Sequence, residues 1–268
     1  MATTTSITTT YAGEFAGKYI AAALLSGTTL DNGLVEIKPN VKFKEVIKKV
    51  ATDNIVKNAA CDFDPTSTLT LTERILQPEE FQVNLQLCKK DFRSDWEAVQ
   101  MGYSVYDNLP PSFTDFLLAH VAEKVAQRIE TNIWQGANAT AGQFDGFSTL
   151  FAADGDVVDV TGTTVTAANV ITEMGKVADA IPAALYGKED LTIYVPQNVA
   201  KAYVRALGGF GASGLGAAGM DNKGTMWYGD QPLYFDGIRV AMVNGLGANK
   251  MVATQSSNLF FGTGLLSD

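Results

Sequence analysis

Glycine-rich motifs come closest to a site for chemistry in this sequence. The pattern GxGxxG occurs twice in succession, at Gly209–Gly214 and at Gly214–Gly219. In a dinucleotide site that pattern follows a strand and opens a helix, so that free backbone amides and the helix dipole meet the phosphates. Here the glycines follow a predicted helix, and no helix can be read from Met220 onwards. We therefore interpret residues 208–219 as a loop. A phospholigand-binding enzyme that uses this loop is the weaker alternative.

Side chains that carry out nucleophilic or metal chemistry are also scarce. His120 is the only histidine, and no serine or cysteine lies in a recognisable nucleophile motif. Cys61 and Cys88 stand alone, without a CxxC pair or a second histidine to complete a metal site. The adjacent carboxylates Glu79–Glu80 and Glu189–Asp190 lie beside turn residues, where solvated loops explain them. We predict no catalytic, cofactor-binding or metal site, and we expect that the protein is not an enzyme.

The charge of the chain is unevenly distributed. The net charge is −9 and the pI is about 4.7, which argues against general electrostatic binding of nucleic acid. Between Glu36 and Lys57, however, six lysines are accompanied by only three carboxylates. Such a basic stretch is either a solvated face or one half of a charge pair between subunits, and the sequence leaves both readings open.

The bulk composition indicates a soluble protein of one or two domains. With 268 residues, of which 46% are hydrophobic, the chain can bury a real core. Two cysteines cannot form a disulfide framework, so a reducing compartment is expected. No apolar run has the length of a membrane span, and Met1 leads into a threonine-rich tract rather than a signal peptide. We expect a protein that is soluble and intracellular when it is made.

A long helix is the element around which the rest of the chain is organised. Between Ser112 and Gly136 apolar residues recur at every fourth position, which predicts a helix with one buried face. Ser112 and Asp115 suit a capping box, Pro110–Pro111 forbids an earlier start, and Gly136 suits a left-handed stop. About 23 residues at 1.5 Å each give a rod of roughly 35 Å. Alone, it would fit a core helix of an ordinary α/β domain. We call residues 112–136 the spine helix.

The chain before the spine helix is predicted to be mostly extended. A polar N-terminal arm leads into a short helix at residues 14–25. Residues 43–50 fit either a strand or a helical turn, and residues 69–72 resemble a strand. Four apolar residues alternate strictly with polar ones, which is typical of a half-buried strand: Phe81, Val83, Leu85 and Leu87. A thin β-arm of this kind, here residues 34–92, normally finds its burial on a neighbouring molecule.

The chain after the spine helix is predicted to form a unit of mixed helices and strands. Aspartate followed by glycine at Asp236–Gly237 is a strong hairpin signal. A helix–strand–helix run before it is compatible with a mixed α/β domain. The predicted elements are helices at 166–185 and 198–207, and strands at 191–195, 233–235, 238–243, 251–253 and 259–261.

Several segments together carry a family resemblance: Thr72–Pro78, Phe81–Phe92, Ile133–Gly136, Asp145–Phe147, Phe235–Val240 and Asn258–Asp268. In these segments and in the order of its parts, the chain resembles the major capsid proteins of tailed phages, which have the Johnson, or Hong Kong ninety-seven, fold. The resemblance covers nearly the whole chain, and residues 73–92 are most similar to the capsid proteins of crAss-like phages. The implied fold class is α+β, with an N-terminal arm, an extended β-arm, a spine helix in a peripheral domain, and an α/β axial domain.

The resemblance implies a division of the chain into parts. These are an N-terminal arm and short helix (1–33), the extended loop or β-arm with its roots (34–92), a peripheral domain with the spine helix (93–164), an axial domain with a glycine-rich loop at 208–224 (165–254), and an incomplete return towards the peripheral domain (255–268). Because relatives continue further, we expect the native product to extend some tens of residues beyond Asp268. Intersubunit contacts are expected at Lys42, Lys44, Phe81, Val83, Leu85, Leu87, Gly211, Gly214 and Gly216.

The implied function is self-assembly into the icosahedral shell that encloses the genome of a tailed double-stranded DNA phage. The implied partners are copies of the chain itself as pentamers and hexamers, a separate scaffolding protein, a portal and optional decoration proteins. Packaged DNA would be held only loosely, and no cofactor or membrane is required. The implied location is the virion capsid, assembled in the cytoplasm of the host bacterium. A nanocompartment (encapsulin-like) shell protein is an alternative, whereas a decoration or tail protein would lack the spine helix and β-arm.

Overall fold

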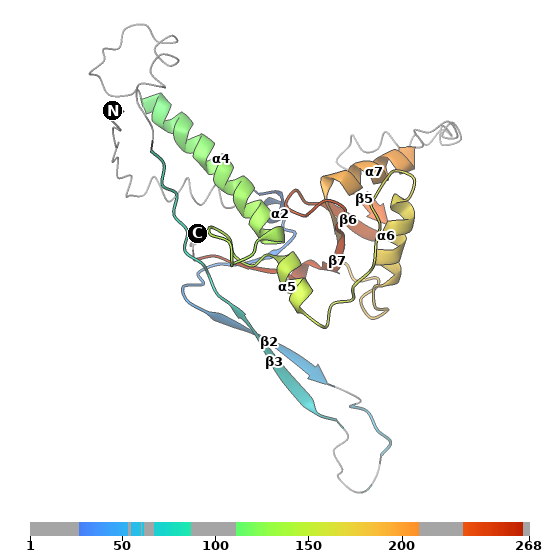
Figure 1. Ribbon diagram of the computed structural model, residues 1–268. Helices are drawn as coiled ribbons and strands as arrows, with labels where there is room; N and C mark the ends of the chain where they lie inside the picture. The colour runs from blue at the N-terminus through green and yellow to red at the C-terminus, as the bar shows by residue number, and fades with distance from the viewer. Residues whose placement is uncertain are drawn as a thin grey trace, which may run out of the picture. The chain divides into compact units, whose positions relative to one another are not determined.

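The computed structural model describes residues 27–52, 55–59, 61, 67–86, 111–208 and 233–264 (Figure 1). The chain is a mixed α+β protein with two compact units. The larger unit comprises Met1–Glu36 and Phe81–Leu259, and the smaller unit comprises Ile37–Glu80 and Phe260–Asp268. Within the described ranges, no helix combines the length and the apolar character needed to cross a membrane.

A four-stranded sheet lies at the centre of the larger unit, in the order β5-β6-β4-β7. Strand β4 (Leu191–Val195) runs parallel to β6 (Ile238–Met242) and antiparallel to β7 (Val252–Gln255). Strand β5 (Leu233–Phe235) pairs antiparallel with β6. The predicted strands of this part of the chain are therefore confirmed to within two residues.

The turn between β5 and β6 follows from its two residues. The backbone φ angle is 48° at Asp236 and 79° at Gly237. Positive φ at both central residues is the geometry of a type I′ turn, whose twist matches that of the flanking strands and which favours glycine at the second position. The hairpin predicted at Asp236–Gly237 is confirmed.

Two helices pack on one face of this sheet. Helices α6 (Val170–Asp179) and α7 (Gln197–Gly208) turn their apolar sides towards it. Successive side chains of a strand point to opposite faces, so β4 divides its residues between two cores. Leu191, Ile193 and Val195 join the core beneath the helices.

The end of the long helix α4 (Pro111–Gln135) covers the opposite face of the sheet. The ring centroid of Trp134 lies 5.2 Å from that of Tyr194 on β4. It lies 5.4 Å from that of Phe147, the first residue of α5 (Phe147–Ala153). All three rings are buried. This aromatic cluster joins α4, α5 and the sheet into one unit.

Helix α4 confirms the predicted spine helix to within one residue at each end. The predicted left-handed stop is wrong, because Gly136 does not have a positive φ. A Cβ atom at Gly136 would instead collide with the carbonyl oxygen of Phe144 and lie 2.7 Å from that of Asn132. The N–H of Gly146 donates to the carbonyl of Gly136 at 2.9 Å. Glycine is therefore required so that the following loop can turn back against the helix end.

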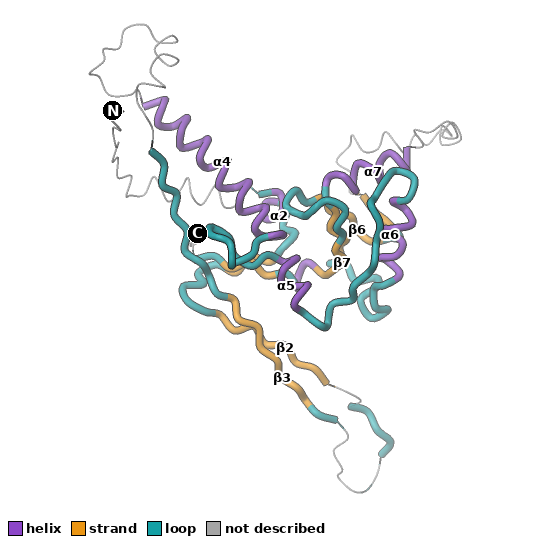
Figure 2. The backbone as a smooth tube through the Cα atoms, in the orientation of Figure 1, coloured by secondary structure: helices purple, strands orange, loops and turns teal. Residues whose placement is uncertain are grey.

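The smaller unit consists of two strand pairs (Figure 2). Strand β1 (Glu36–Lys38) pairs with β8 (Phe260–Gly262). Strands β2 (Glu45–Thr52) and β3 (Leu69–Leu76) form an antiparallel hairpin. The choice left open for residues 43–50 is thus settled as a strand from Glu45 onwards. The strand predicted at residues 69–72 is confirmed and continues to Leu76.

The strand predicted at residues 81–87 is wrong for the residues that are described. Residues 81–86 have no regular secondary structure. Phe81, Val83 and Leu85 are 53–61% exposed. An alternating pattern identifies an extended amphipathic segment, but it cannot supply the second strand that a hydrogen-bonded ladder needs. Strand β3 pairs with β2 instead.

The helix predicted at residues 166–185 is shorter in the structure. The side-chain oxygen of Asn169 accepts a hydrogen bond from the N–H of Thr166 at 2.7 Å, which fixes a turn ahead of α6. Pro182 has no N–H and disfavours helical backbone before it, which explains the end of the helix at Asp179. Ile171, in the first turn of α6, is 51% exposed.

Short helical turns complete the described chain. Helix α2 (Thr28–Asp31) follows Gly27, and a 3₁₀ turn, η3 (Ser256–Asn258), connects β7 to the last strand. The short helix predicted at residues 14–25 and the glycine-rich loop predicted at 208–224 lie outside the described residues, except for Gly208 at the end of α7. The domain boundaries implied by the family resemblance stay a prediction.

Candidate interaction surface

The β2–β3 hairpin has two chemically different faces. In its antiparallel register Val46 lies opposite Ile75, and Val50 lies opposite Leu71. Directly opposite residues share a face, and so do alternate residues along each strand. One face therefore carries five aliphatic side chains, which we call the apolar stripe: Val46, Val50, Leu69, Leu71 and Ile75.

The apolar stripe is open to solvent. Its five side chains are 46–63% exposed. Covering half-exposed aliphatic side chains gains roughly 1 kcal/mol each, on the order of 5 kcal/mol for the stripe. An isolated two-stranded hairpin is only marginally stable in water, and soluble monomers seldom gather several exposed aliphatic side chains on one face. The stripe therefore has the properties of an interaction surface.

The opposite face of the hairpin is more polar and is anchored at its base. It carries Glu45, Ile47, Lys49, Ala51, Thr70, Thr72, Arg74 and Leu76. A Cβ atom at Gly262 of β8 would lie 2.7 Å from the side chain of Leu76, so this face packs on the neighbouring strand pair of the same unit. Glu45 and Ile47 are only partly exposed there. The smaller unit thus uses one face of the hairpin for its own packing and leaves the apolar face open.

Two opposite charges help to fix this arrangement. Lys48 lies directly across from Glu73, on the same face as the apolar stripe. Opposite charges at such a cross-strand position stabilise a pair by about 0.2–1 kcal/mol, and like charges destabilise it. A slip of the register by one residue would remove this pairing and would turn one strand's apolar residues to the other face. The charge pair therefore favours the register that gathers the apolar stripe on one face of the hairpin.

Two of the lysines predicted as contact residues lie just before β2. Lys42 and Lys44 are both exposed. The Nζ atom of Lys44 lies 5.6 Å from the ring centroid of Phe43, which is 78% exposed. The basic stretch identified in the sequence therefore leads directly into the strand that carries part of the apolar stripe.

The other predicted contact residues do not belong to the hairpin. Phe81, Val83 and Leu85 are exposed but belong to the larger unit. Leu87, Gly211, Gly214 and Gly216 lie outside the described residues. Sequence reasoning did not single out the apolar stripe, although part of its signal was present in the alternating apolar residues of 69–72.

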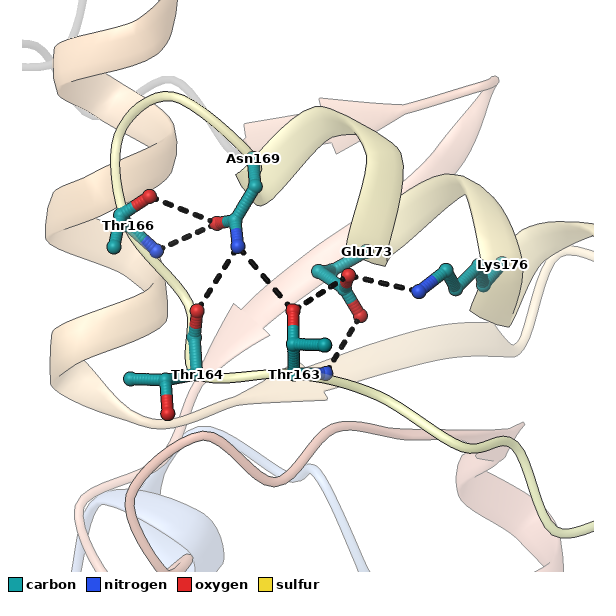
Figure 3. A network of polar contacts seen from close by, with 6 residues as sticks. All are labelled: Thr163, Thr164, Thr166, Asn169, Glu173 and Lys176. Carbon is teal, nitrogen blue, oxygen red and sulfur yellow. Dashed lines mark hydrogen bonds and ion pairs between the residues drawn. The ribbon is translucent and has the colours of Figure 1, made fainter.

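Carboxylates in the larger unit serve as structural ties. Glu173 is 4% exposed and accepts hydrogen bonds from Thr163, from its N–H at 3.1 Å and its hydroxyl at 2.9 Å (Figure 3). The ammonium group of Lys176 lies 2.8 Å from the same carboxylate. These contacts, that of Lys176 above all, hold the pKa of Glu173 below its ordinary value. Glu173 therefore fastens the segment before α6 to that helix.

Asp190 has a similar structural role. Its carboxylate accepts hydrogen bonds from Ser257 at 2.6 Å and from Gln255 at 2.8 Å. These donors, Ser257 first, lower the pKa of Asp190. The expectation that Asp190 belongs to a solvated loop is therefore incomplete, because it ties β4 to the end of β7. Ser257 is engaged in the same contact.

In the described part of the chain, we see no cluster of side chains arranged for catalysis or for metal binding. Among those residues, no three His, Cys, Asp or Glu side chains come together in a way that could hold a metal ion. His120 lies exposed on α4, and Cys61 is an exposed free cysteine. The expectation that the protein is not an enzyme stays a prediction.

Comparisons with known proteins add one structural likeness. No family model matches the sequence, and no curated protein matches it. A solved structure described as "Satellite phage P4 procapsid including size determination (Sid) protein" contains a similar chain. The match is 11% identical, covers 90% of this chain and 81% of that chain, and has a TM-score of 0.48. A likeness of this strength decides neither the fold nor the function.

Proposed function

We propose that this chain is a major capsid protein, which self-assembles into the icosahedral shell around the genome of a tailed double-stranded DNA phage. The observation that carries the proposal is the apolar stripe on the β2–β3 hairpin. Its side chains are 46–63% exposed although they form an ordered apolar face. A face of this kind gains its burial on another molecule, and a shell supplies that molecule as a further copy of the same chain.

The remaining architecture supports the same proposal. The 25-residue helix α4 follows the hairpin in the chain and precedes a mixed sheet-and-helix unit, in the order expected of the capsid family. In this assignment the hairpin is the extended arm, α4 is the spine helix of the peripheral domain, and the β5-β6-β4-β7 sheet with α6 and α7 belongs to the axial domain. The described carboxylate clusters are occupied by structural contacts, which favours a structural protein over an enzyme.

The proposal includes the partners that a capsid requires. Copies of the chain form pentamers and hexamers, with a separate scaffolding protein and a portal, and decoration proteins as an optional addition. A net charge of −9 suits a shell in which DNA is packed by a motor and is held only loosely by the wall. The protein is assembled in the host cytoplasm and remains in the virion capsid.

Assembly of matched hairpin variants tests the proposal. Val50→Asp with Leu71→Asp places two charges in the apolar stripe, and Ala51→Asp with Thr70→Asp places the same charges on the opposite face at adjacent positions. An uncompensated buried charge costs several kcal/mol, so we expect the stripe variant to remain folded but to form no particles. The opposite-face variant and the unsubstituted protein should form closed particles. All three proteins should have the same circular dichroism spectrum, as expected if the stripe variant is folded. Electron microscopy and light scattering provide the readouts.

The opposite result is equally clear. Full-sized particles from the stripe variant would show that the hairpin is not an assembly surface and would remove the main support for the proposal. The contents of native particles separate the two kinds of shell. DNA supports the phage capsid, whereas an enclosed enzyme without DNA identifies a nanocompartment.

A further inference from the structure

A second exposed apolar set lies in the larger unit. Leu150 on α5 and three valines in the segment after it are 37–61% exposed. We call these four residues the acceptor patch: Leu150, Val157, Val158 and Val160. They do not belong to the buried core around β4. The chain thus exposes one apolar set on its hairpin and another beside α5.

The acceptor patch lies in an acidic part of the sequence. Asp154, Asp156 and Asp159 are interspersed with its valines, and no lysine or arginine occurs between Arg128 and Lys176. The first strand of the hairpin has the opposite character, because β2 lies within the stretch from Glu36 to Lys57, which holds six lysines and three carboxylates. Two surfaces that are both apolar and carry opposite charges are complementary to each other.

The segment that holds the acceptor patch begins with a local turn and is tied to other elements at its end. At its start, the N–H of Asp156 donates to the side chain of Asp154 at 3.1 Å. At its end, Glu173 binds the N–H and hydroxyl of Thr163 (Figure 3). The N–H of Val165 donates to Asn249 at 3.0 Å. Surfaces that are ordered before binding lose less conformational entropy on association, so this segment suits a docking surface.

We propose that the apolar stripe of one copy packs on the acceptor patch of a second copy. This inference rests on the proposed function and names the surface that the hairpin meets. The contact joins two different surfaces, so each copy offers one hairpin and receives another, and repetition around an axis closes a ring. Apolar burial supplies most of the affinity. Lys48 and the neighbouring lysines approach the aspartates of the patch and fix the orientation.

Mixed disulfide crosslinking tests this contact. Two proteins are made in a background without the native cysteines (Cys61→Ser, Cys88→Ser), one with Leu71→Cys in the stripe and one with Val158→Cys in the patch, and a tag on one gives the heterodimer its own mass. Because a disulfide requires Cβ atoms about 3.5–4.5 Å apart, we expect at least about tenfold more heterodimer than from a Thr70→Cys control. Thr70 is adjacent to Leu71 but lies on the other face. Val50→Cys, tested in the same way, covers the second strand.

Each outcome of the crosslinking has a defined meaning. Heterodimer above the control from either stripe position supports the contact. Particles that form normally without such heterodimer overturn the inference and leave the shell function standing. A disulfide within single chains that carry both Leu71→Cys and Val158→Cys, with no mixed heterodimer, places the contact inside one chain and also overturns it. Failure of the unsubstituted protein to form particles would count against the proposed function itself, and the inference would fall with it.

A charge in the acceptor patch gives an independent readout. Val158→Asp should raise the concentration needed for assembly by more than about tenfold, because a charged group would replace an aliphatic side chain that packs against the aliphatic side chains of the stripe. Thr172→Asp adds the same charge at an exposed position in the first turn of α6, where an acidic residue is favourable, and should assemble normally. Equal assembly of the two variants contradicts the proposed contact.

Discussion

At the scale of single residues, a buried carboxylate holds the first described turn of the chain. Glu130 on α4 is 5% exposed. The indole N–H of Trp134 donates to the hydroxyl oxygen of Thr29 at 2.8 Å, so the hydroxyl hydrogen of Thr29 is directed to Glu130 at 2.5 Å. The N–H of Thr29 and the hydroxyl of Thr28 donate to the same carboxylate, each at 3.1 Å. All the groups facing Glu130 in this network are donors, so it requires an acceptor on both oxygens.

Glu130→Gln should therefore destabilise the protein although it preserves size and shape. The new amide NH₂ would face a donor, and leaving a buried polar group unsatisfied costs about 1–3 kcal/mol. Glu123→Gln is the matched control on the same helix, because the carboxylate of Glu123 is exposed and accepts a hydrogen bond from Gln127 at 2.9 Å. We expect the control to change the free energy of unfolding by less than about 0.5 kcal/mol. Urea denaturation measures both, and equal effects would contradict the role assigned to Glu130.

Tyr194 makes the fold sensitive to alkaline pH. Its side chain is fully buried, its hydroxyl donates to the carbonyl of Leu34 at 2.7 Å, and burial raises the pKa of this tyrosine well above its ordinary value of 10.0. Above about pH 10 the unfolded state therefore loses this proton while the folded state keeps it. The free energy of unfolding should then fall with rising pH, by up to about 1.4 kcal/mol per unit from this residue.

Substitution isolates the contribution of Tyr194 to this pH dependence. Tyr194→Phe should be less stable at neutral pH, because the carbonyl of Leu34 loses its donor, but its stability should fall less steeply above pH 10. Tyr234→Phe, at an exposed position, is the control and should retain the slope. Tyr203, whose pKa is also raised by burial, remains in both variants. The free energy of unfolding is measured from pH 8 to 11. If it fell equally steeply with pH in all three proteins, the role assigned to Tyr194 would be refuted.

At the scale of elements, the sequence pattern correctly predicted those elements that depend on interactions between residues close together in the chain. The four-residue spacing of apolar side chains located α4 to within one residue at each end, and Asp236–Gly237 located the β5–β6 turn. The reason for Gly136 was not visible in the sequence, because the carbonyl that excludes a Cβ atom belongs to the loop that returns from Phe144. Close approaches between chain segments depend on the tertiary fold, which a spacing pattern does not contain.

Strand pairing marks the limit of the sequence reasoning. Apolar residues alternate with polar ones both in 69–72 and in 81–87, yet the first segment belongs to a strand and residues 81–86 do not. A strand needs a partner for its backbone N–H and C=O groups, and no local pattern specifies which segment will provide it. For the same reason the apolar stripe could be assembled only after the pairing of Val50 with Leu71 was known. The exposure of Lys42 and Lys44 was predictable, whereas the outward direction of the apolar face was not.

At the scale of the whole molecule, charge sets a condition on assembly. Every copy carries a net charge of −9, so whole copies repel each other. The lysines before and within β2 and the aspartates beside the acceptor patch attract only at close contact. The Debye length is about 30 Å at 0.01 M salt and about 8 Å at 0.15 M, so added salt screens the long-range repulsion before it screens a contact pair. Apolar burial is not weakened by this screening.

The salt dependence of assembly should therefore run opposite to that of a contact made mainly of ion pairs. We expect the critical concentration for particle formation to fall about three- to tenfold between 0.01 and 0.15 M sodium chloride, and to change little up to about 0.5 M. Light scattering with electron microscopy measures it, and the Val50→Asp, Leu71→Asp variant controls for salt-induced aggregation because it should form no particles at any salt concentration. A critical concentration that rises steadily with salt would mean that ion pairs hold the copies together. In that case the apolar stripe would not be the main source of affinity, since screening acts on charges and leaves the burial of its five aliphatic side chains intact.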